Sequence, residues 1–518
     1  MKKILLLLTF SLSFVQMRAD EGMWLLMLIK RLNGVDMQKQ GLHLTPEEIY
    51  SANNSSLKDA IVQFGGGCTA EIVSDQGLLL TNHHCGYGSI AALSTPEKDY
   101  LTNGYWSMKK SEELPSPGLS VRFLVRMDDA TQRINGKLNN SMTAEQRKSI
   151  IDAEYKAIQQ ENSENGKYTV VVRDFFNGNE FYYFVYQDYK DVRFVGTPPA
   201  SLGKFGGDTD NWEWPRHTAD FSVFRIYADA NGNPAEYSPN NVPLKPKHSL
   251  PISLKGYKPG DFTMIVGFPG RTNRYLTSYG IQQMVDKDYP AWVEASKAAM
   301  DVMKKYMDKD QATKLNYASQ YAGVANYWKN RQGTIDAVKK NGTITDKQNL
   351  EKKYLTWALL PENEAAYGGV VNDLGAYYQQ ISNRNVERNY MAQLSRNSKY
   401  LRIASQLGSL FKTYADQPAA EQAKMKQKIS DAINEAYNGF NTQLEGEMLA
   451  SLTSLYQLRT NKDVASPTLL GANASTLSNT AYSSIFATKE SAMNFLNNPD
   501  RLKIDGDPLY KFANGVTT

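Results

Sequence analysis

Two adjacent histidines, His83 and His84, stand in the part of the sequence whose residue types are best suited to chemistry. The stretch runs from Cys68 to Tyr87 and reads C-T-A-E-I-V-S-D-Q-G-L-L-L-T-N-H-H-C-G-Y. Cys68 and Cys85 are the only two cysteines of the chain, and three glycines precede the first of them. Because an imidazole exchanges a proton near neutral pH, this histidine pair is a candidate general base.

A β-hairpin is predicted to position these histidines. An apolar run, Ala70–Val73, is followed by a turn at Asp75-Gln76-Gly77 and a second apolar run, Leu78–Thr81, which ends just before them. A disulfide between Cys68 and Cys85 would fix the histidines relative to the first strand. In the loop-entropy model so short a closure contributes about 3 kcal/mol of stability.

Two other interpretations of the histidine pair stay open at this point. A histidine among apolar residues is often only a packed side chain. His83, His84 and Cys85 are also residue types that bind zinc, but no Cys-x-x-Cys, His-Glu-x-x-His or second cluster completes a ligand shell. We therefore predict no metal site, and a metallo-hydrolase is the weakest alternative.

A second stretch, Gly203–Tyr227, has the composition of a binding loop that leads into a strand. It reads G-K-F-G-G-D-T-D-N-W-E-W-P-R-H-T-A-D-F-S-V-F-R-I-Y. The strand, Phe221–Tyr227, does not need the glycines, tryptophans and aspartates before it, whereas a binding loop does. Asp220 lies directly before the strand, where a carboxylate could orient an imidazole from another hairpin. Taken alone, the stretch would be interpreted as a surface loop capped by this aspartate.

Three motifs together resemble those of the bacterial dipeptidyl-peptidase 7 and dipeptidyl-peptidase 11 family. They are G-G-G-C-T with T-N-H-H-C-G-Y-G, then G-K-F-G-G-D-T-D-N-W-x-W-P-R-H-T-x-D-F-S, then G-F-P-G-R-T-N-R-Y. Gly22-Met23-Trp24 and the A-N-Y-W-K-N of residues 325–330 are similar too, so the resemblance covers essentially the whole mature chain. The resemblance implies an exported serine exopeptidase with a chymotrypsin-like double β-barrel and an added helical domain. Such enzymes release dipeptides from free N-termini and are typically homodimers.

The resemblance also assigns roles to single residues. It makes His84, the histidine before Cys85, the general base, and it makes Asp220 the carboxylate that orients this base. The residues that it places at the amine of the substrate are Asn211, Trp212 and Asn326, with Asn330 near the last. An amide oxygen beside an aromatic wall is a partial cage for an ammonium ion. No cofactor is implied, and the expected partners are oligopeptides with a free N-terminus.

One part of such a peptidase is not found in the sequence. The resemblance implies a nucleophilic serine in a Gly-Asp-Ser-Gly-like or Gly-Asn-Ser-Gly-like turn of a second barrel, and no such turn occurs. We therefore expect a C-terminally truncated member whose first barrel exposes apolar surface. Because loss of a triad nucleophile lowers kcat by about 10⁶-fold, the chain alone should be nearly or wholly inactive. The alternative is a non-catalytic peptide-binding or interaction protein built from the same parts.

The N-terminus and the overall charge bear on localisation and partners. Lys2-Lys3, the apolar run Ile4–Val15 and a small residue, Ala19, predict a signal peptide over residues 1–19. The run is too short to span a bilayer, so we expect a periplasmic or secreted protein, in which a disulfide can form. A net charge of +4 over 518 residues argues against nucleic acid as the main partner.

The succession of strand-like and helix-like segments along the sequence predicts an α+β protein with more than one domain. Residues 20–275 are expected to form the chymotrypsin-like antiparallel β-barrel region, residues 276–505 an all-helical domain, and residues 506–518 the start of the missing C-terminal barrel. Thr45, Pro46 and Glu48 predict a capped helix start before the first strands. The other predicted strands are Leu119–Arg126, Tyr168–Phe175, Phe181–Tyr189, Phe221–Tyr227 and Phe262–Gly267. The predicted helices are Thr143–Gln160, Ala291–Met307, Gln311–Lys329, Asp346–Leu360, Val370–Ser382 and Ala419–Gln443.

Overall fold

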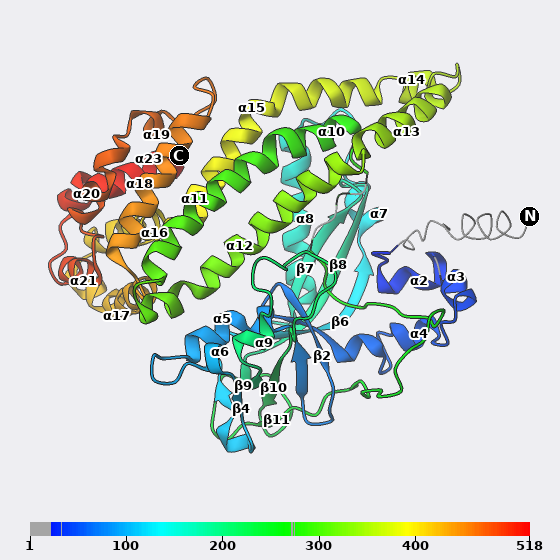
Figure 1. Ribbon diagram of the computed structural model, residues 1–518, viewed down its shortest axis with the longest axis horizontal. Helices are drawn as coiled ribbons and strands as arrows, with labels where there is room; N and C mark the ends of the chain where they lie inside the picture. Colours follow the sequence, from blue (N-terminus) through cyan, green and yellow to red (C-terminus); the bar gives the residue numbers. More distant parts are fainter. Residues whose placement is uncertain (1–21, 33, 271–272, 274, 518) are drawn as a thin grey trace, which may run out of the picture. The chain divides into compact units, whose positions relative to one another are not determined.

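The computed structural model describes residues 22–32, 34–270, 273 and 275–517, so the predicted signal peptide lies outside the described residues. The chain combines a large antiparallel sheet with many helices, which confirms the predicted α+β class (Figure 1). It divides into two compact units. Unit 1 comprises residues 1–81, 117–193 and 224–269, and unit 2 comprises residues 82–116, 194–223 and 270–518.

Unit 1 is built on antiparallel strands that pair in the order β10-β3-β2-β1-β6-β8-β7, with β11 beside β10. The predicted hairpin is present as β2 and β3, with Glu71 opposite Leu80. Strands β9 and β10 both run across the boundary between the units. The strands are β1 (Ile61–Phe64), β2 (Cys68–Ile72), β3 (Leu78–Thr81), β6 (Val121–Asp129), β7 (Thr169–Phe175), β8 (Glu180–Tyr189), β9 (Asp191–Thr197), β10 (Ser222–Ala228) and β11 (Val242–Pro243).

Two helices pack on the β7–β8 hairpin and form the main apolar cluster of this part of unit 1. Helix α8 begins after Thr143, which forms a capping box with Gln146. The helices are α7 (Thr131–Asn135) and α8 (Ala144–Asn162). The cluster that they share with the strands contains Ala130, Ile134, Ile158, Val170, Val172, Phe181 and Val185. Burial of these apolar side chains supplies most of the free energy that holds helices to a sheet.

The N-terminal helices of unit 1 explain one wrong strand prediction. The capping box predicted at Thr45 is present, with both of its hydrogen bonds to Glu48. The segment Phe262–Gly267, however, forms no strand. Phe262 and Met264 instead pack against the cluster of Ile29, Leu42 and Ile49, so the alternation of apolar residues there serves packing on helices. The elements are η1 (Leu26–Leu28), α2 (Ile29–Leu32), α3 (Gly34–Lys39), α4 (Pro46–Ile49) and η2 (Leu57–Ala60).

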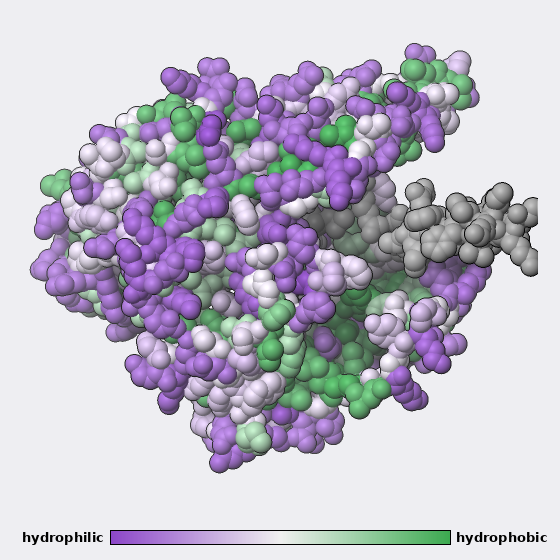
Figure 2. All heavy atoms as spheres, viewed as in Figure 1, coloured by the Kyte–Doolittle hydropathy of each residue, from purple (hydrophilic) through white to green (hydrophobic). Residues whose placement is uncertain are grey.

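Unit 2 is mostly helical. Helix α11 (Tyr289–Met307) packs along α12 (Gln311–Lys340) and α15 (Val370–Asn397), as Figure 1 shows. Hydrophilic side chains gather over the outer faces of these long helices in Figure 2, as expected for amphipathic helices with one buried face. The large buried cluster of unit 2 includes Tyr317, Tyr400, Phe411, Tyr456 and Phe486.

The remaining elements of unit 2 complete the helical core and its N-terminal part. The helices are α5 (His83–Leu93), α6 (Tyr100–Asn103), η3 (Lys110–Glu112), α9 (Ala200–Gly203), α10 (Ser278–Gln283), η4 (Met284–Asp288, a π-helical turn), α13 (Thr343–Ala358), α14 (Glu364–Tyr367), α16 (Lys399–Ala415), α17 (Ala419–Ala436), α18 (Thr442–Arg459), α19 (Pro467–Gly471), η5 (Ala474–Thr476), α20 (Leu477–Tyr482), α21 (Lys489–Asn497), α22 (Arg501–Gly506) and α23 (Pro508–Thr517). The short strands are β4 (Tyr105–Trp106), which pairs with β9, and β5 (Leu114–Pro115).

Two expected boundaries differ in the structure. The segment Ala419–Gln443 forms two helices, because a turn with Gly439 at φ +61° separates α17 from α18. Residues 508–517, which we expected to begin a further barrel, form α23. Leu509, Tyr510 and Phe512 of α23 are buried in the helical cluster, so the helical core extends past residue 505. Among the residues described, no helix is both long and apolar enough for a membrane span.

Candidate active site

His84 lies in the first turn of α5, directly after strand β3. The strand ends at Thr81, and Asn82 is the N-cap of the helix. The side chain of Asn82 does not cap its own helix but donates hydrogen bonds to the carbonyl oxygen and the carboxylate of Asp220. Ser222, at the start of β10, donates a hydrogen bond to the carbonyl oxygen of Asn82. The beginnings of α5 and β10 are therefore joined by hydrogen bonds from both sides.

Asp220 accepts two hydrogen bonds from one residue, His84. Its Oδ1 accepts the main-chain N–H of His84 at 3.0 Å, and its Oδ2 lies 2.7 Å from the Nδ1 atom of the ring. A carboxylate at the N-terminus of a helix is also stabilised by the partial positive charge of the unpaired N–H groups there. The aspartate thus caps α5 and sets the ring orientation of the residue that α5 presents.

The electrostatics of Asp220 favour its ionised form. Burial alone would raise the pKa of this carboxyl, but the hydrogen bonds from the ring and the main chain of His84 lower the pKa by more. An ionised carboxylate only accepts, so Nδ1 of His84 must carry the proton in this pair. In the neutral imidazole Nε2 then keeps its lone pair, and the side chain is 67% exposed. A proton acceptor that faces solvent is what a general base requires.

His83 points the other way and is packed inside unit 2. Its ring is 1% exposed, and its Nε2 has no hydrogen-bond partner among the residues that the structure describes. The ring lies edge-on to Tyr87 and directly against the main chain of Gly203, where a Cβ atom would be 2.5 Å from His83 Cδ2. Burial lowers the pKa of His83, so the neutral imidazole is favoured. Of the pair, only His84 has an exposed ring with a carboxylate partner.

The segment between Gly203 and Asp220 is a loop whose two ends meet. The N–H of Ala219 donates to the carbonyl oxygen of Leu202 at 3.0 Å, which closes the loop at its base. Gly206 has φ +78°, and a Cβ atom there would overlap the Asp210 carboxylate, so this turn requires glycine. The loop therefore starts at the packing partner of His83 and ends at the carboxylate that holds His84.

The three residues expected at the amine of a substrate lie together. Asn211 Nδ2 donates to Asn326 Oδ1 at 2.9 Å, and Trp212 Nε1 lies 3.0 Å from the same oxygen and 3.1 Å from the Asn326 carbonyl oxygen. Trp212 has φ +61°, which is strained for a residue with a side chain and is often found at binding sites. Asn330 follows one turn later on α12. These hydrogen bonds join Asn326, rather than Asn330, to Asn211 and Trp212.

Sequence reasoning missed one polar partner of this group. Arg216 donates from Nη1 to Asn211 Oδ1 at 3.3 Å, and its Nη2 lies 3.4 Å from the Thr218 hydroxyl. The R-H-T segment of the loop motif contained this arginine, but nothing in the spacing indicated which side chain it would contact. Sequence reasoning also missed the role of Asp220 as a helix cap, because the cap comes from a residue 136 positions away.

The two cysteines are joined in a disulfide. A metal site of His83, His84 and Cys85 would need a thiolate at Cys85, and a sulfur in a disulfide cannot supply one. His83 and His84 also point to different surroundings. The structure therefore gives no support to the metallo-hydrolase alternative.

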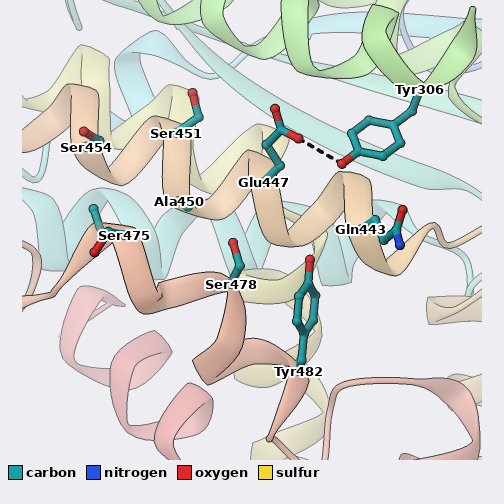
Figure 3. Close-up of a pocket in the computed structure, with 10 residues that line it drawn as sticks. Tyr306, Gln443, Glu447, Ala450, Ser451, Ser454, Ser475, Ser478 and Tyr482 are labelled. Carbon is teal, nitrogen blue, oxygen red and sulfur yellow. Dashed lines mark hydrogen bonds between the residues drawn. The ribbon is translucent and has the colours of Figure 1, made fainter.

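A separate cavity lies within the helical part of unit 2 and contains none of these residues. It has a volume of about 480 Å³ and is lined mainly by hydroxyl groups from α11, α18, η5 and α20 (Figure 3). Glu447 in this cavity accepts hydrogen bonds from Tyr306 and Lys305. Because it contains neither the histidine–aspartate pair nor the Asn211 group, we do not assign it to the active site.

Comparison with known proteins places this chain in a family. The profile of the Peptidase S46 family matches residues 19–518. The chain is 51% identical to dipeptidyl-peptidase 7 of Capnocytophaga gingivalis over 505 residues, which cover 96% of this chain and 70% of that protein. It is 40% identical to the Asp/Glu-specific dipeptidyl-peptidase of the same organism, over 91% of this chain and 66% of that protein.

A solved structure of similar fold agrees with this assignment. The crystal structure of Porphyromonas endodontalis DPP11 in complex with the dipeptide Arg-Glu superposes with a TM-score of 0.84 at 31% identity. The match covers 96% of this chain and 73% of that one. The fold and the family profile thus define a chain of the peptidase class. The chain belongs to the Peptidase S46 family.

Proposed function

We propose that this protein is a serine-type dipeptidyl aminopeptidase that releases dipeptides from the free N-termini of oligopeptides. The hydrogen-bonded pair of His84 and Asp220 is the observation that carries the proposal. In such an enzyme the Nε2 atom of His84 takes the proton of a serine hydroxyl as the hydroxyl attacks the peptide carbonyl. Asp220 holds the imidazole in the required tautomer and stabilises the imidazolium that forms.

Recognition of the substrate amine explains why two residues, and not one or three, would be removed. An ammonium ion needs hydrogen-bond acceptors and gains from an aromatic face. Asn211 Oδ1 and the ring of Trp212 supply both, and Asn326 fixes their positions. An incoming ammonium would replace Arg216 at Asn211 Oδ1, so binding exchanges one cation for another. The distance from this anchor to the scissile bond then sets the length of the product.

The proposed reaction also needs a nucleophile, and the expected serine turn is not found in the sequence. No serine in the sequence is followed by glycine, so the expected Gly-x-Ser-Gly turn is absent from these 518 residues. Within the described residues, no serine hydroxyl is hydrogen-bonded to the ring of His84. We infer that the chain by itself has little or no peptidase activity.

A non-catalytic peptide-binding protein is the second candidate function. The amine-binding group of Asn211, Trp212 and Asn326 is assembled within unit 2 and needs no nucleophile to hold an ammonium ion. This alternative and the first share the substrate class, peptides with a free N-terminus. They differ only in whether a bond is cleaved.

The setting of the protein follows from the same proposal. We infer a periplasmic or secreted protein, because the N-terminal sequence has the form of a signal peptide and the cysteines are oxidised. We further infer that the enzyme is a homodimer. No nucleic acid and no cofactor enter the proposed reaction.

A paired peptide digest and a binding titration test the proposal together. Purified protein is incubated with peptides that have free or acetylated N-termini, and the products are read by mass spectrometry. The same peptides, free and acetylated, are titrated in a calorimeter. Dipeptides released from the free set alone, with loss of release in His84→Ala, would support the peptidase and overturn our inference about the nucleophile.

The binding titration distinguishes the remaining outcomes. Binding of free-amine peptides without cleavage supports a peptide-binding half-site that lacks its serine. Asn326→Ala should weaken this binding by roughly tenfold, because Asn211 and Trp212 lose the side-chain hydrogen bonds that fix their positions. Asn330→Ala is the matched control, one turn away on the same helix, and should bind as the wild type does. Absence of both cleavage and free-amine binding would contradict the proposal.

A further inference from the structure

Two arginines of unit 2 lie against the same two aromatic rings. The Cζ atom of Arg331, on α12, is 3.6 Å from the centre of the Trp292 ring and 5.4 Å from that of Tyr327. The Cζ atom of Arg396, on α15, is 5.5 Å and 5.7 Å from the centres of these two rings. Two positive charges therefore share one aromatic platform at the junction of α11, α12 and α15.

Stacking on the platform does not itself use the hydrogen-bond donors of these side chains. A guanidinium carries five N–H donors in its plane, and a ring against its face accepts none of them in a normal hydrogen bond. The Nη1 atom of Arg331 is buried and has no partner in the part of the chain that the structure describes. Cation–π attraction accounts for the position of the guanidinium but not for its in-plane N–H groups.

No acidic side chain among the described residues neutralises this pair. Burial lowers the pKa of Arg331, Tyr289 and Tyr327 act in the opposite sense, and Arg396 lowers it as a like charge. No carboxylate acts on this guanidinium. Like charges in a partly desolvated place repel each other more strongly than at an open surface.

Another arginine of this protein shows what a completed pair looks like. Arg193, in unit 1, also stacks on an aromatic ring, with its Cζ atom 3.6 Å from the centre of Tyr227. Its Nε and Nη2 atoms donate to the two carboxylate oxygens of Asp191 at 2.9 and 2.8 Å. Such a two-pronged contact is the favoured partner of a guanidinium. Arg331 and Arg396 have the aromatic half of this arrangement without the anionic half.

We propose that Arg331 and Arg396 form a binding site for an oxyanion, a carboxylate or a phosphate, on the platform of Trp292 and Tyr327. The site is open to a ligand from solvent, because Arg396 is exposed and Tyr327 is 47% exposed. Arg331 follows Asn326 by five residues, which places it roughly 140° around the axis of α12. The contacts that carry this proposal involve none of His84, Asp220 and Asn326, so it does not depend on the proposed peptidase function.

Protection of Arg396 against an arginine-specific reagent tests the proposal on the intact chain. Phenylglyoxal modifies exposed arginines, and peptide mapping by mass spectrometry reads the rate at each one. Inorganic phosphate, succinate and chloride are compared at constant ionic strength. At ten times the dissociation constant, a bound anion should slow modification of Arg396 by about tenfold by mass action. Arg388, an exposed arginine on the same helix, is the internal control and should be modified at an unchanged rate.

Two variants distinguish anion binding at this site from a general effect of the salt on arginine modification. Arg331→Met keeps an unbranched apolar stem but removes the charge and the donors, and it should abolish protection of Arg396. Arg388→Gln should leave the protection intact. Protection by phosphate alone assigns a tetrahedral anion, and protection by succinate alone assigns a carboxylate. The proposal would be overturned if the anions slowed the modification of Arg396 and Arg388 equally, or if phosphate and succinate slowed the modification of Arg396 no more than chloride does. Protection of Arg396 that survives in Arg331→Met would also overturn it.

Discussion

Asp220 accepts a main-chain N–H and a ring N–H from the same residue, His84, and this double contact couples the stability of a helix to the chemistry of a base. If the carboxylate moved to release the ring, the first turn of α5 would lose its cap. If α5 shifted, the ring would lose its orientation. A mobile surface histidine has neither constraint, so the contact distinguishes His84 from a histidine that is only exposed.

Replacement of the carboxylate should therefore be measurable without any enzymatic assay. We expect Asp220→Asn to lower the free energy of unfolding at pH 7 by roughly 1–3 kcal/mol, the range for a lost hydrogen bond to a charged group. The pKa of Asp220 is lowered in the folded protein, so its contribution is present above the unfolded pKa and is lost as pH falls through the folded value. The difference between wild type and variant should thus shrink in acid.

Urea unfolding at pH 7 and pH 3 would measure this difference. Asp75→Asn is the matched control, because Asp75 is exposed in the turn between β2 and β3. It should unfold like the wild type at both values. Equal stability of Asp220→Asn and wild type at pH 7 would show that the contact contributes nothing.

His83 predicts a second and separate pH dependence. Its pKa is lowered by burial, so below about pH 6.5 the unfolded chain binds a proton that the folded chain does not bind. Stability should fall as pH decreases from the unfolded pKa towards the folded one, with a slope of at most about 1.4 kcal/mol per pH unit. His83→Leu should lose this slope between pH 7 and pH 5.

The comparison needs a histidine variant that keeps the slope. His217 is exposed in the loop after Trp212, so His217→Gln should follow the wild type over the same range. Chemical unfolding at half-unit steps would resolve the difference. Identical slopes for His83→Leu and wild type would mean that protonation of His83 is not what acid acts on.

At the scale of elements, α18 contains a glycine that its neighbour α20 requires. Gly446 is buried in the second turn of the helix, where glycine costs about 1 kcal/mol relative to alanine. A Cβ atom there would overlap the Tyr482 hydroxyl, and the ring atoms next to that hydroxyl would be 2.7 Å away. Ser478 donates to the Gly446 carbonyl oxygen at 2.8 Å, so α20 lies directly on the helix backbone beside the cavity of Figure 3.

We therefore expect Gly446→Ala to destabilise the protein although alanine is the better helix former. Overpacking of a tight contact typically costs about 1–3 kcal/mol, which exceeds the gain in helix propensity. Gly323→Ala is the matched control, because a Cβ atom at this glycine in α12 meets nothing within 4 Å. It should raise the melting temperature. If Gly446→Ala also raised it, the contact with Tyr482 would be looser than the structure shows.

Short-range patterns in the sequence predicted many helices and strands, but they could not predict contacts between residues far apart in the chain. The hairpin of β2 and β3, the capping box at Thr45 and the start of α8 follow from residues a few positions apart. The hydrogen bonds between Trp212 and Asn326 join residues 114 positions apart, and no periodicity encodes them. The motifs of the resemblance named these residues, but only the folded chain shows that they touch each other.

Errors in the predicted elements have the same cause. An alternating segment such as Phe262–Gly267 looks like a strand when it is read alone, but packing against helices overrides that preference. The sequence predicts a helix that ends at Ser382, whereas α15 continues to Asn397 because Tyr390 and Leu394 are buried in the helical cluster. Tertiary burial, and not local propensity, decided both cases.

At the scale of the whole molecule, unit 1 exposes apolar residues where a soluble protein normally covers them. Leu254 is 95% exposed, Ile265 is fully exposed at 100%, and Ile252 and Tyr257 are exposed by 64% and 84%. All four belong to one irregular segment near the end of unit 1. Single exposed apolar residues are common, but several in one segment are typical of a surface that another structure covers.

We therefore expect the purified chain to bind a hydrophobic dye such as ANS in its native state. We also expect its melting temperature to rise when this segment is made polar. Leu254→Ser combined with Ile265→Ser should reduce native dye fluorescence by about half or more, if dye binding scales with exposed apolar area. Met108→Ser is the control, because Met108 is 87% exposed in unit 2 and outside the segment. Negligible dye binding by the wild type, together with a cooperative melt, would show that the segment is covered in solution.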